Sequence, residues 1–371
     1  MGPYRPTDIP AAIAESIAAV RAPDPAWALR AAERQSRLTM PPGSLGRVLE
    51  IGQQLASIQG TDRPWGHPAL IAVFAADHGV AEAGVSAYPQ AVTGQMVANY
   101  LAGGAAVNVL ARRAGAEVRV VDLGVRSLPP GSEGHPGLIA RSIRGGTTNV
   151  LEGPAMTRDE AFRAFATGLE LADRWLGSEG FRVVALGEMG IGNTTTAAML
   201  AAALTGASPE KVVGRGTGID AAGLSRKREV VARALAIHAP ATSDVWDTIS
   251  RLGGFEIIGL AGLAVGAARV GGLVVIDGFI SAVAGMVAAF LCPPASGSFC
   301  AAHLGAEPGH AVVLDQLGIW PLFRWNLRLG EGSGAALALP IIAASADLLR
   351  DMATFASADI SGPLPGETNP T

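Results

Sequence analysis

Short runs of apolar residues recur along the chain, and each run stops at an acidic residue close to a glycine. The runs cover residues 69–75, 117–121, 181–186 and 273–276. Apolar runs of this length, bounded by turn residues, are typical of strands buried on both faces of a parallel sheet. The pattern therefore predicts four such strands.

Longer stretches with helical character lie between and around these runs. They cover residues 9–20, 24–37, 48–58, 92–114, 155–176, 197–204 and 335–350. Alternation of strand and helix is typical of a parallel sheet covered by helices on both faces. We predict an α/β protein with a Rossmann-like large domain.

The acidic residues that end the four runs are Asp77, Asp122, Glu188 and Asp277. Ligands of parallel sheets bind beyond the carboxyl ends of the strands, so these acids are predicted to gather along one rim. A plainer alternative is that each acid only caps the following helix or forms a turn.

Residues 187–196, between a predicted strand and a predicted helix, form a loop suited to a phosphate group. The loop reads Gly-Glu-Met-Gly-Ile-Gly-Asn-Thr-Thr-Thr. Glycines let backbone N–H groups approach an anion, hydroxyls add donors, and the helix that follows directs its positive end to the same place. Glu188 adds a carboxylate at the mouth of the loop. The combination indicates chemistry on a phosphorylated substrate.

A second glycine-rich loop covers residues 214–220, and Lys227 follows it. Arg215 and Lys227 would place positive charge beside the backbone N–H groups, as a phosphate monoester requires. The loop lacks the Lys-Ser/Thr ending of a Walker motif, so alone it is a weak signal. The alternative is a tight turn with a solvated Arg215 and a Lys227 on a helix surface.

Glu331 lies between glycines in residues 328–335, directly before an apolar helix. Flanking glycines leave the carboxylate free to project into a cleft, and the helix N-terminus helps to keep it ionised. This placement suits a general base. The alternative is an acid that only complements the helix dipole.

The segment 84–96 contains side chains that could form the wall of a site for a flat heteroaromatic ligand. Tyr88, Pro89 and Met96 offer apolar surface and Gln95 offers a hydrogen-bonding edge. Nearby, His78 follows Asp77, but neighbouring residues of a strand point to opposite faces. We therefore expect a buried, hydrogen-bonded His78 and not an Asp-His dyad.

Composition excludes several function classes. The net charge is -4 and the 28 Lys and Arg residues are dispersed, which argues against nucleic-acid binding. Two cysteines without a CxxC spacing indicate free thiols in a reducing compartment, and residues 1–10 contain no apolar core of a signal peptide, so we predict a cytoplasmic protein. Six scattered histidines, with no HExxH sequence, predict no metal site.

One apolar segment, residues 270–292, is long enough to span a membrane. Glycines interrupt it, and Asp277 would place a charge within the span. We therefore interpret the segment as a buried strand followed by a separate helix, and predict no membrane insertion.

Taken in order, the motifs resemble those of the nicotinate-nucleotide:dimethylbenzimidazole phosphoribosyltransferase family. The likeness rests on residues 41–46, 76–79, 187–195, 214–220, 277–279 and 329–334. The resemblance implies transfer of the 5-phosphoribosyl group of nicotinate mononucleotide to 5,6-dimethylbenzimidazole. The products would be α-ribazole 5'-phosphate and nicotinate, formed by one displacement that inverts C1'.

The resemblance also implies roles for individual residues. Glu331 matches the family's catalytic base. Positive charge that develops on the ribose can be stabilised by carboxylates on the rim, and Glu188 is our candidate for that second role. Two further sets follow: Tyr88, Pro89, Gln95, Met96 and Leu329 would line the benzimidazole site, and Gly190, Gly192, Asn193, Thr194, Arg215, Gly216 and Lys227 would hold the nucleotide. Tyr88 departs from the smaller residues that occur at its position, which bears on the preferred base.

The family's quaternary and domain organisation is implied in the same way. We expect a homodimer without metal or organic cofactor. Each chain would have a large domain at 65–295, with 326–350 packed on it. A small helical domain would comprise 5–60 and about 296–325, and a disordered tail would follow at 357–371.

Two other functions are compatible with the same residues. A nucleosidase or glycosidase could use Glu188 and Glu331 as paired carboxylates with water as the acceptor. A regulatory protein that binds a nucleotide without turnover would need only the glycine-rich loops.

Overall fold

A computed structural model describes residues 9–240 and 244–361. Its centre is a seven-stranded sheet in which every neighbouring pair of strands is parallel, in the order β3-β2-β1-β4-β5-β6-β7. The strands are β1 (Ala69–Ala76), β2 (Glu117–Gly124), β3 (Leu138–Ala140), β4 (Val183–Met189), β5 (Leu273–Ile276), β6 (Phe299–His303) and β7 (Pro321–Phe323). The predicted α/β fold with a parallel sheet is confirmed.

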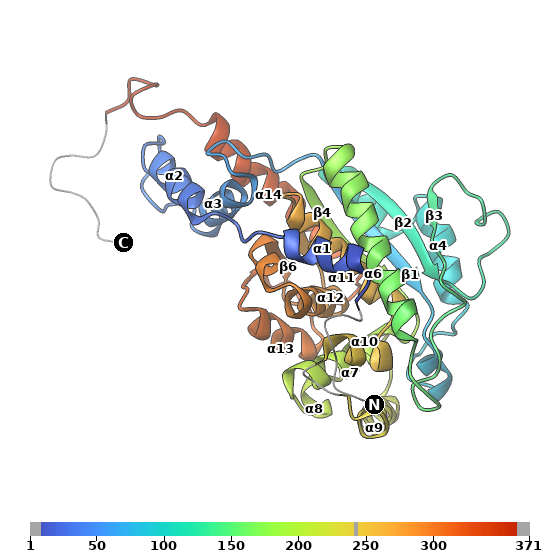
Figure 1. Cartoon of the computed structure of the whole chain (residues 1–371). Coiled ribbons are helices and arrows are strands. Elements are labelled where there is room, and N and C mark those ends of the chain that lie inside the picture. The colour runs from blue at the N-terminus through green and yellow to red at the C-terminus, as the bar shows by residue number, and fades with distance from the viewer. Residues whose placement is uncertain (1–8, 241–243, 362–371) are drawn as a thin grey trace.

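Helices cover both faces of the sheet (Figure 1). They are α1 (Ala11–Ala19), α2 (Pro25–Gln35), α3 (Arg47–Gln59), α4 (Val92–Leu101), α5 (Ala106–Ala114), α6 (Arg158–Ala172), α7 (Asn193–Thr205), α8 (Pro209–Val212), α9 (Ala221–His238), α10 (Val245–Leu252), α11 (Phe255–Arg269), α12 (Phe279–Leu291), α13 (Pro308–Leu317) and α14 (Ser333–Asp351). Short helical turns add η2 (Gly79–Ala83), η3 (Asp173–Ser178) and η4 (Pro293–Ser298).

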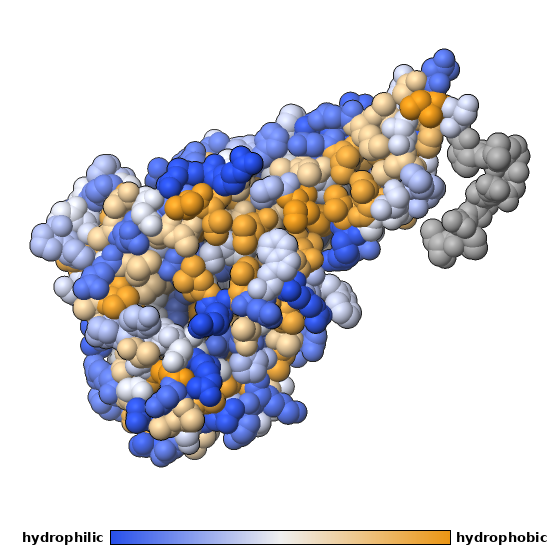
Figure 2. All heavy atoms as spheres, turned by 180° about the vertical axis from the view of Figure 1, so that it is seen from behind, coloured by the Kyte–Doolittle hydropathy of each residue, from blue (hydrophilic) through white to orange (hydrophobic). Residues whose placement is uncertain are grey.

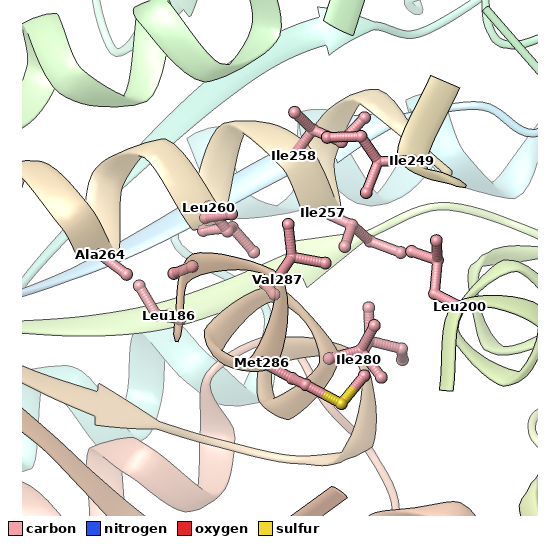
Figure 3. Packing of buried hydrophobic residues seen from close by; sticks show 14 of the residues in the cluster. Leu186, Leu200, Ile249, Ile257, Ile258, Leu260, Ala264, Ile280, Met286 and Val287 are labelled. Atoms are coloured by element: carbon pink, nitrogen blue, oxygen red, sulfur yellow. The ribbon is translucent and has the colours of Figure 1, made fainter. Parts of the chain in front are cut away.

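The core is built around α11, which is buried along nearly its whole length and packs on α6 and α12. Figure 3 shows side chains of α11 and α12 meeting Leu186 of β4. Small residues allow the close approach: a Cβ on Gly168 of α6 would lie 2.0 Å from the carbonyl oxygen of Gly259 on α11. This packing fits a chain with 48 glycines and 5% aromatic residues.

The order of the strands determines where a ligand can bind. The chain moves from β1 to β2 and β3 on one side, and then crosses to β4 and onward on the other. In parallel sheets the crevice lies beyond the carboxyl ends of the strands at this point of reversal. Here that point is between β1 and β4, whose ends carry Asp77 and Glu188.

Helices α2 and α3, together with the end of α14, form an extension beyond the body of the molecule (Figure 1). Helix α3 packs against both α2 and α14. Helix α1 instead contacts α11 and α6 on the sheet domain. The division of the chain into a large and a small domain stays a prediction, but α1 packs with the residues assigned to the large domain.

Several expected elements need correction. Part of the segment 296–325, assigned to the helical domain, forms β6 and β7 at one edge of the sheet. The helix expected at 92–114 is broken into α4 and α5, because Gly103 adopts a left-handed conformation with φ 74°. Of the tail predicted at 357–371, residues 362–371 lie outside the described residues, as do residues 5–8 of the predicted small domain.

The apolar segment 270–292 contains β5 and α12, as predicted. Helix α12 is too short to cross a membrane, and among the described residues one helix, α14, is long and apolar enough to do so. Its membrane-like window is 56% buried within the fold, and buried core helices pass the same test of length and composition. It is therefore weak evidence for a membrane span.

Candidate active site

A cavity of about 590 Å³ lies at the carboxyl ends of the strands. Its lining comes from the glycine-rich loop after β4, the segment from Tyr88 to Ala106, the second glycine-rich loop, residues 278–280 after β5, the loop after β6 and the loop before α14. The predicted site residues among the lining are Tyr88, Met96, Glu188, Gly190, Asn193, Thr194, Gly216, Leu329 and Glu331. These predicted residues come from four segments far apart in the sequence, which therefore meet in one cavity.

Glu331 adopts an unusual backbone conformation at the edge of this cavity. Its φ is 65°, and those of Gly330 and Gly332 are 83° and 86°. Three successive left-handed residues make a sharp turn into α14. A Cβ on Gly330 would lie 2.4 Å from Oε1 of Glu188, so this position requires glycine for space as well as conformation. The turn brings the Glu331 backbone against Glu188.

Asp277 holds this turn in place. Its carboxylate accepts hydrogen bonds from the backbone N–H groups of Gly332 at 3.1 Å and Ala335 at 2.8 Å. It therefore caps α14, not the helix that follows it in the chain, so neither simple alternative for this acid was right. His303 Nε2 lies 3.5 Å from the same carboxylate.

Glu188 is buried at the end of β4. One of its oxygens accepts a hydrogen bond from Asn193 Nδ2, and the other accepts from the Glu331 backbone N–H at 3.3 Å. Burial raises its pKa well above the usual value, and the nearby carboxylates of Asp277, Glu256 and Glu331 raise it further.

Glu331 is also buried, with 8% of its surface exposed, and its Oε2 has no hydrogen-bond partner among the described residues. Burial raises its pKa, the Tyr100 hydroxyl lowers it, and the charge of Asp277 raises it. A carboxylate that lines the cavity, with one oxygen free of hydrogen bonds and a pKa above the ordinary range, is suited to accept a proton.

The nucleotide side of the cavity is formed by the N-terminus of α7. Gly192 precedes the helix with φ 101°, and the side chain of Thr194 accepts a hydrogen bond from Lys227 Nζ at 2.7 Å. Lys227 is fully buried, and burial lowers its pKa to about 8. The alternative of a lysine on a helix surface is therefore wrong.

The second glycine-rich loop is engaged by a residue that the sequence analysis missed. Glu307, which precedes α13, accepts a hydrogen bond from the backbone N–H of Gly216 at 2.8 Å, and its charge raises the pKa of Lys227. Arg215 is exposed and donates to the carbonyl of Ile219 within its own loop at 2.7 Å. The structure does not bring Arg215 to the cavity.

Only some of the residues predicted for the acceptor side lie in the lining of the cavity. Tyr88, Met96 and Leu329 line the cavity, whereas Pro89 and Gln95 are exposed and lie outside its lining. Gln95 follows Gly94 on α4 and faces away, because the buried face of this helix carries Thr93, Gly94, Val97 and Tyr100.

His78 is fully buried and hydrogen-bonded at both ring nitrogens, as predicted. Nε2 lies 2.7 Å from Glu256 Oε1 and Nδ1 lies 2.9 Å from Thr196 Oγ1. Asp77 instead accepts a hydrogen bond from the backbone N–H of Arg126 at 2.9 Å. A Cβ on Gly190 would lie 3.0 Å from His78 Nε2, so the imidazole packs against the glycine-rich loop.

Asp122 forms a turn after its own strand. It accepts hydrogen bonds from the backbone N–H groups of Gly124 and Val125, both at 2.8 Å. This is the plainer of the two alternatives for this acid, and Asp122 does not line the cavity.

Tyr100, Phe279, His303 and Glu307 are the main residues of the site that sequence reasoning missed. Phe279, His303 and Glu307 line the cavity, and Tyr100 lies behind it beside Glu331. Of these residues, only Phe279 belongs to one of the sequence motifs described above. No local sequence pattern marks the buried face of α4 or the β6–α13 loop as part of a site. Among the described residues, no group of three or more potential metal ligands occurs.

Comparison with known proteins gives a consistent result. A phosphoribosyltransferase family model matches residues 20–360. The nicotinate-nucleotide–dimethylbenzimidazole phosphoribosyltransferase of Chloroflexus aggregans is 48% identical over 90% of this chain and 94% of its own length. The enzyme of the same name from Pseudomonas aeruginosa is 47% identical over 92% of this chain and 96% of its own. This chain belongs to the nicotinate-nucleotide–dimethylbenzimidazole phosphoribosyltransferase family.

A solved structure from this family extends the agreement to three dimensions. The nicotinate-nucleotide-dimethylbenzimidazole phosphoribosyltransferase of Thermus thermophilus matches with a TM-score of 0.85 and 44% identity. The match covers 92% of this chain and 100% of the other. The family resemblance drawn from the sequence motifs is confirmed.

Proposed function

We propose that this protein transfers the 5-phosphoribosyl group of nicotinate mononucleotide to 5,6-dimethylbenzimidazole. The observation that carries the proposal is the pairing of Glu331 with an anion-binding loop in one cavity. A phosphorylated substrate requires an anion site such as this helix N-terminus with its buried lysine, and a proton-releasing acceptor requires a carboxylate oxygen that is free of hydrogen bonds.

The chemistry follows from the two substrates. The pyridinium of nicotinate mononucleotide carries a positive charge, so nicotinate leaves with the bonding electrons of C1' and needs no general acid. A ring nitrogen of the benzimidazole forms the new bond to C1', and the proton on its other nitrogen becomes acidic. Glu331 accepts that proton. Attack opposite the leaving group inverts C1' and gives the α-nucleotide.

Positive charge on the ribose would be stabilised by Glu188 in this mechanism. Although its burial favours the protonated form, a bound cationic substrate favours the ionised form. Gly190, Asn193, Thr194, Gly216 and Lys227 would hold the nucleotide, with Gly192 shaping the loop. Tyr88, Met96 and Leu329 would contact the acceptor.

We also propose that the protein is a homodimer and that it is located in the cytoplasm. Large hydrophobic side chains remain exposed at Leu45, Trp320, Trp325 and Leu329. Figure 2 shows apolar surface continuing from the helical extension onto the body of the molecule. Extended exposed apolar surface often marks a protein interface, and a second copy would cover it.

Mass spectrometry of the reaction product tests the proposal. Purified protein with nicotinate mononucleotide and 5,6-dimethylbenzimidazole should give α-ribazole 5'-phosphate. Ribose 5-phosphate as the only new product would instead favour a nucleosidase, and nucleotide binding without any product would favour a regulatory protein.

A further inference from the structure

Tyr88 lies on an exposed loop that has few attachments of its own. The side chain of Tyr88 is 55% exposed although it lines the cavity. Its backbone N–H donates to Ser86 Oγ at 3.2 Å, within the same loop. The loop ends at Gln90, whose Nε2 donates to the carbonyl of His78 at 3.0 Å. The part that carries Tyr88 therefore needs support from another element.

That support comes from the second glycine-rich loop. Thr217 Oγ1 accepts a hydrogen bond from the backbone N–H of Ala87 at 3.0 Å, and it lies 3.3 Å from Ser86 Oγ. Thr217 directly follows Gly216, whose backbone N–H donates to Glu307, and both Gly216 and Glu307 line the cavity. One hydroxyl thus joins the residue before Tyr88 to the nucleotide-binding loop.

Helix α9, which follows this loop, also contacts both the loop that carries Tyr88 and the nucleotide side. Arg226 donates to the carbonyl of Gly84 at 3.2 Å, and the next residue, Lys227, donates to Thr194 on the nucleotide side at 2.7 Å. The segment from Gly216 to Lys227 therefore contacts both sides of the cavity.

Resting on the proposed function, we propose that Thr217 is a positioning residue for the acceptor: its hydroxyl holds the Ala87–Tyr88 backbone so that Tyr88 closes the acceptor side. Thr217 itself lines the cavity, but in this role it acts through Tyr88 and not on the reacting atoms. Thr217 lies in a loop whose residue types suggest only phosphate binding. In this proposal its hydroxyl instead increases the affinity for the acceptor substrate.

The expected effect is a change in KM for one substrate. Replacing Thr217 with valine keeps the shape of the side chain and removes the hydroxyl that accepts from Ala87. Loss of one such hydrogen bond corresponds to roughly a 3- to 10-fold weakening. KM for dimethylbenzimidazole should rise by about that factor, whereas KM for nicotinate mononucleotide and kcat should change less than about twofold.

Steady-state kinetics with both substrates varied separately provides the test. Thr217→Ser keeps the hydroxyl and should retain an acceptor KM near the wild-type value. Thr167→Val is a matched control, because the Thr167 hydroxyl on α6 donates to the carbonyl of Arg163 at 2.9 Å and lies outside the cavity lining. Thermal unfolding of each variant reports on its fold.

The outcomes separate this proposal from the proposed function. If wild-type protein makes no α-ribazole 5'-phosphate, the proposed function fails. If wild type is active and Thr217→Val leaves the acceptor KM unchanged, or raises both KM values equally, the positioning role is refuted. A selective rise in acceptor KM that Thr217→Ser does not show would support it.

Discussion

Replacing Glu331 with glutamine removes the proposed general base and keeps its size. The substitution leaves the turn before α14 intact, because that turn is held by backbone groups bonded to Asp277 and Glu188. Since burial raises the pKa of Glu331, a neutral glutamine should fold as stably as the wild type at neutral pH. The variant therefore isolates proton removal from folding.

The size of the loss depends on whether another group can take the proton. Glu188 is the candidate that the structure places beside Glu331, but both its oxygens accept hydrogen bonds, from Asn193 and from the Glu331 backbone. We therefore expect the full contribution of a general base to be lost, a fall in kcat of about 10²- to 10⁴-fold. This corresponds to about 3 to 5 kcal/mol of transition-state stabilisation.

Product formation at saturating substrates, with nucleotide binding measured by calorimetry, gives the required readouts. Binding of nicotinate mononucleotide should change less than a few-fold. Glu170→Gln is a suitable control, because Glu170 pairs with Arg141 on the surface of α6, away from the cavity. Wild-type activity in Glu331→Gln would refute the assignment of the base.

Three further predictions concern pH and charge. Tyr100→Phe removes a contact that lowers the pKa of Glu331, so the acidic limb of the kcat/KM profile should move to higher pH. Asp277→Asn removes a charge that raises the pKa of Glu331, so the same limb should move to lower pH. Lys227→Met should raise KM for nicotinate mononucleotide at least about tenfold, and the wild-type KM should itself rise above pH 8 as Lys227 loses its proton. Glu188→Gln should lower activity, and the melting temperature of the variant relative to wild type should be higher at pH 8 than at pH 5. The raised pKa of Glu188 contributes stability below its ordinary value, and that stability is lost as pH rises through the folded-state pKa. An unchanged profile, KM or melting temperature would contradict the corresponding assignment.

The central part of the sheet was predictable from local pattern alone. Strands β1, β2, β4 and β5 are mainly apolar runs that end close to acids, with Glu117 and Arg119 the charged exceptions at the start of β2, and all four were predicted. Strands β3, β6 and β7 were not predicted: Leu138–Ala140 and Pro321–Phe323 are three residues long and form the two edges of the sheet, and Phe299–His303 directly follows the proline- and glycine-rich turn η4. At the edge of a sheet, pairing with a neighbour decides the conformation, and a single sequence does not contain that pairing.

Residues of the site were predictable where glycines mark the backbone. The loops around Gly192, Gly216 and Glu331 all contribute to the site. Contacts between distant segments were not predictable, such as Asp277 capping α14 or Glu307 bonding Gly216. Arg215 shows the opposite error, because its charge suggested a phosphate ligand but its side chain closes its own loop.

The central claim is that the phosphoribosyl group passes to a second substrate and not to water. Release of nicotinate from nicotinate mononucleotide, measured with and without 5,6-dimethylbenzimidazole, tests this claim most directly. We predict that release depends on the acceptor and matches the α-ribazole 5'-phosphate formed. Equal rates of release with and without the acceptor would contradict the account.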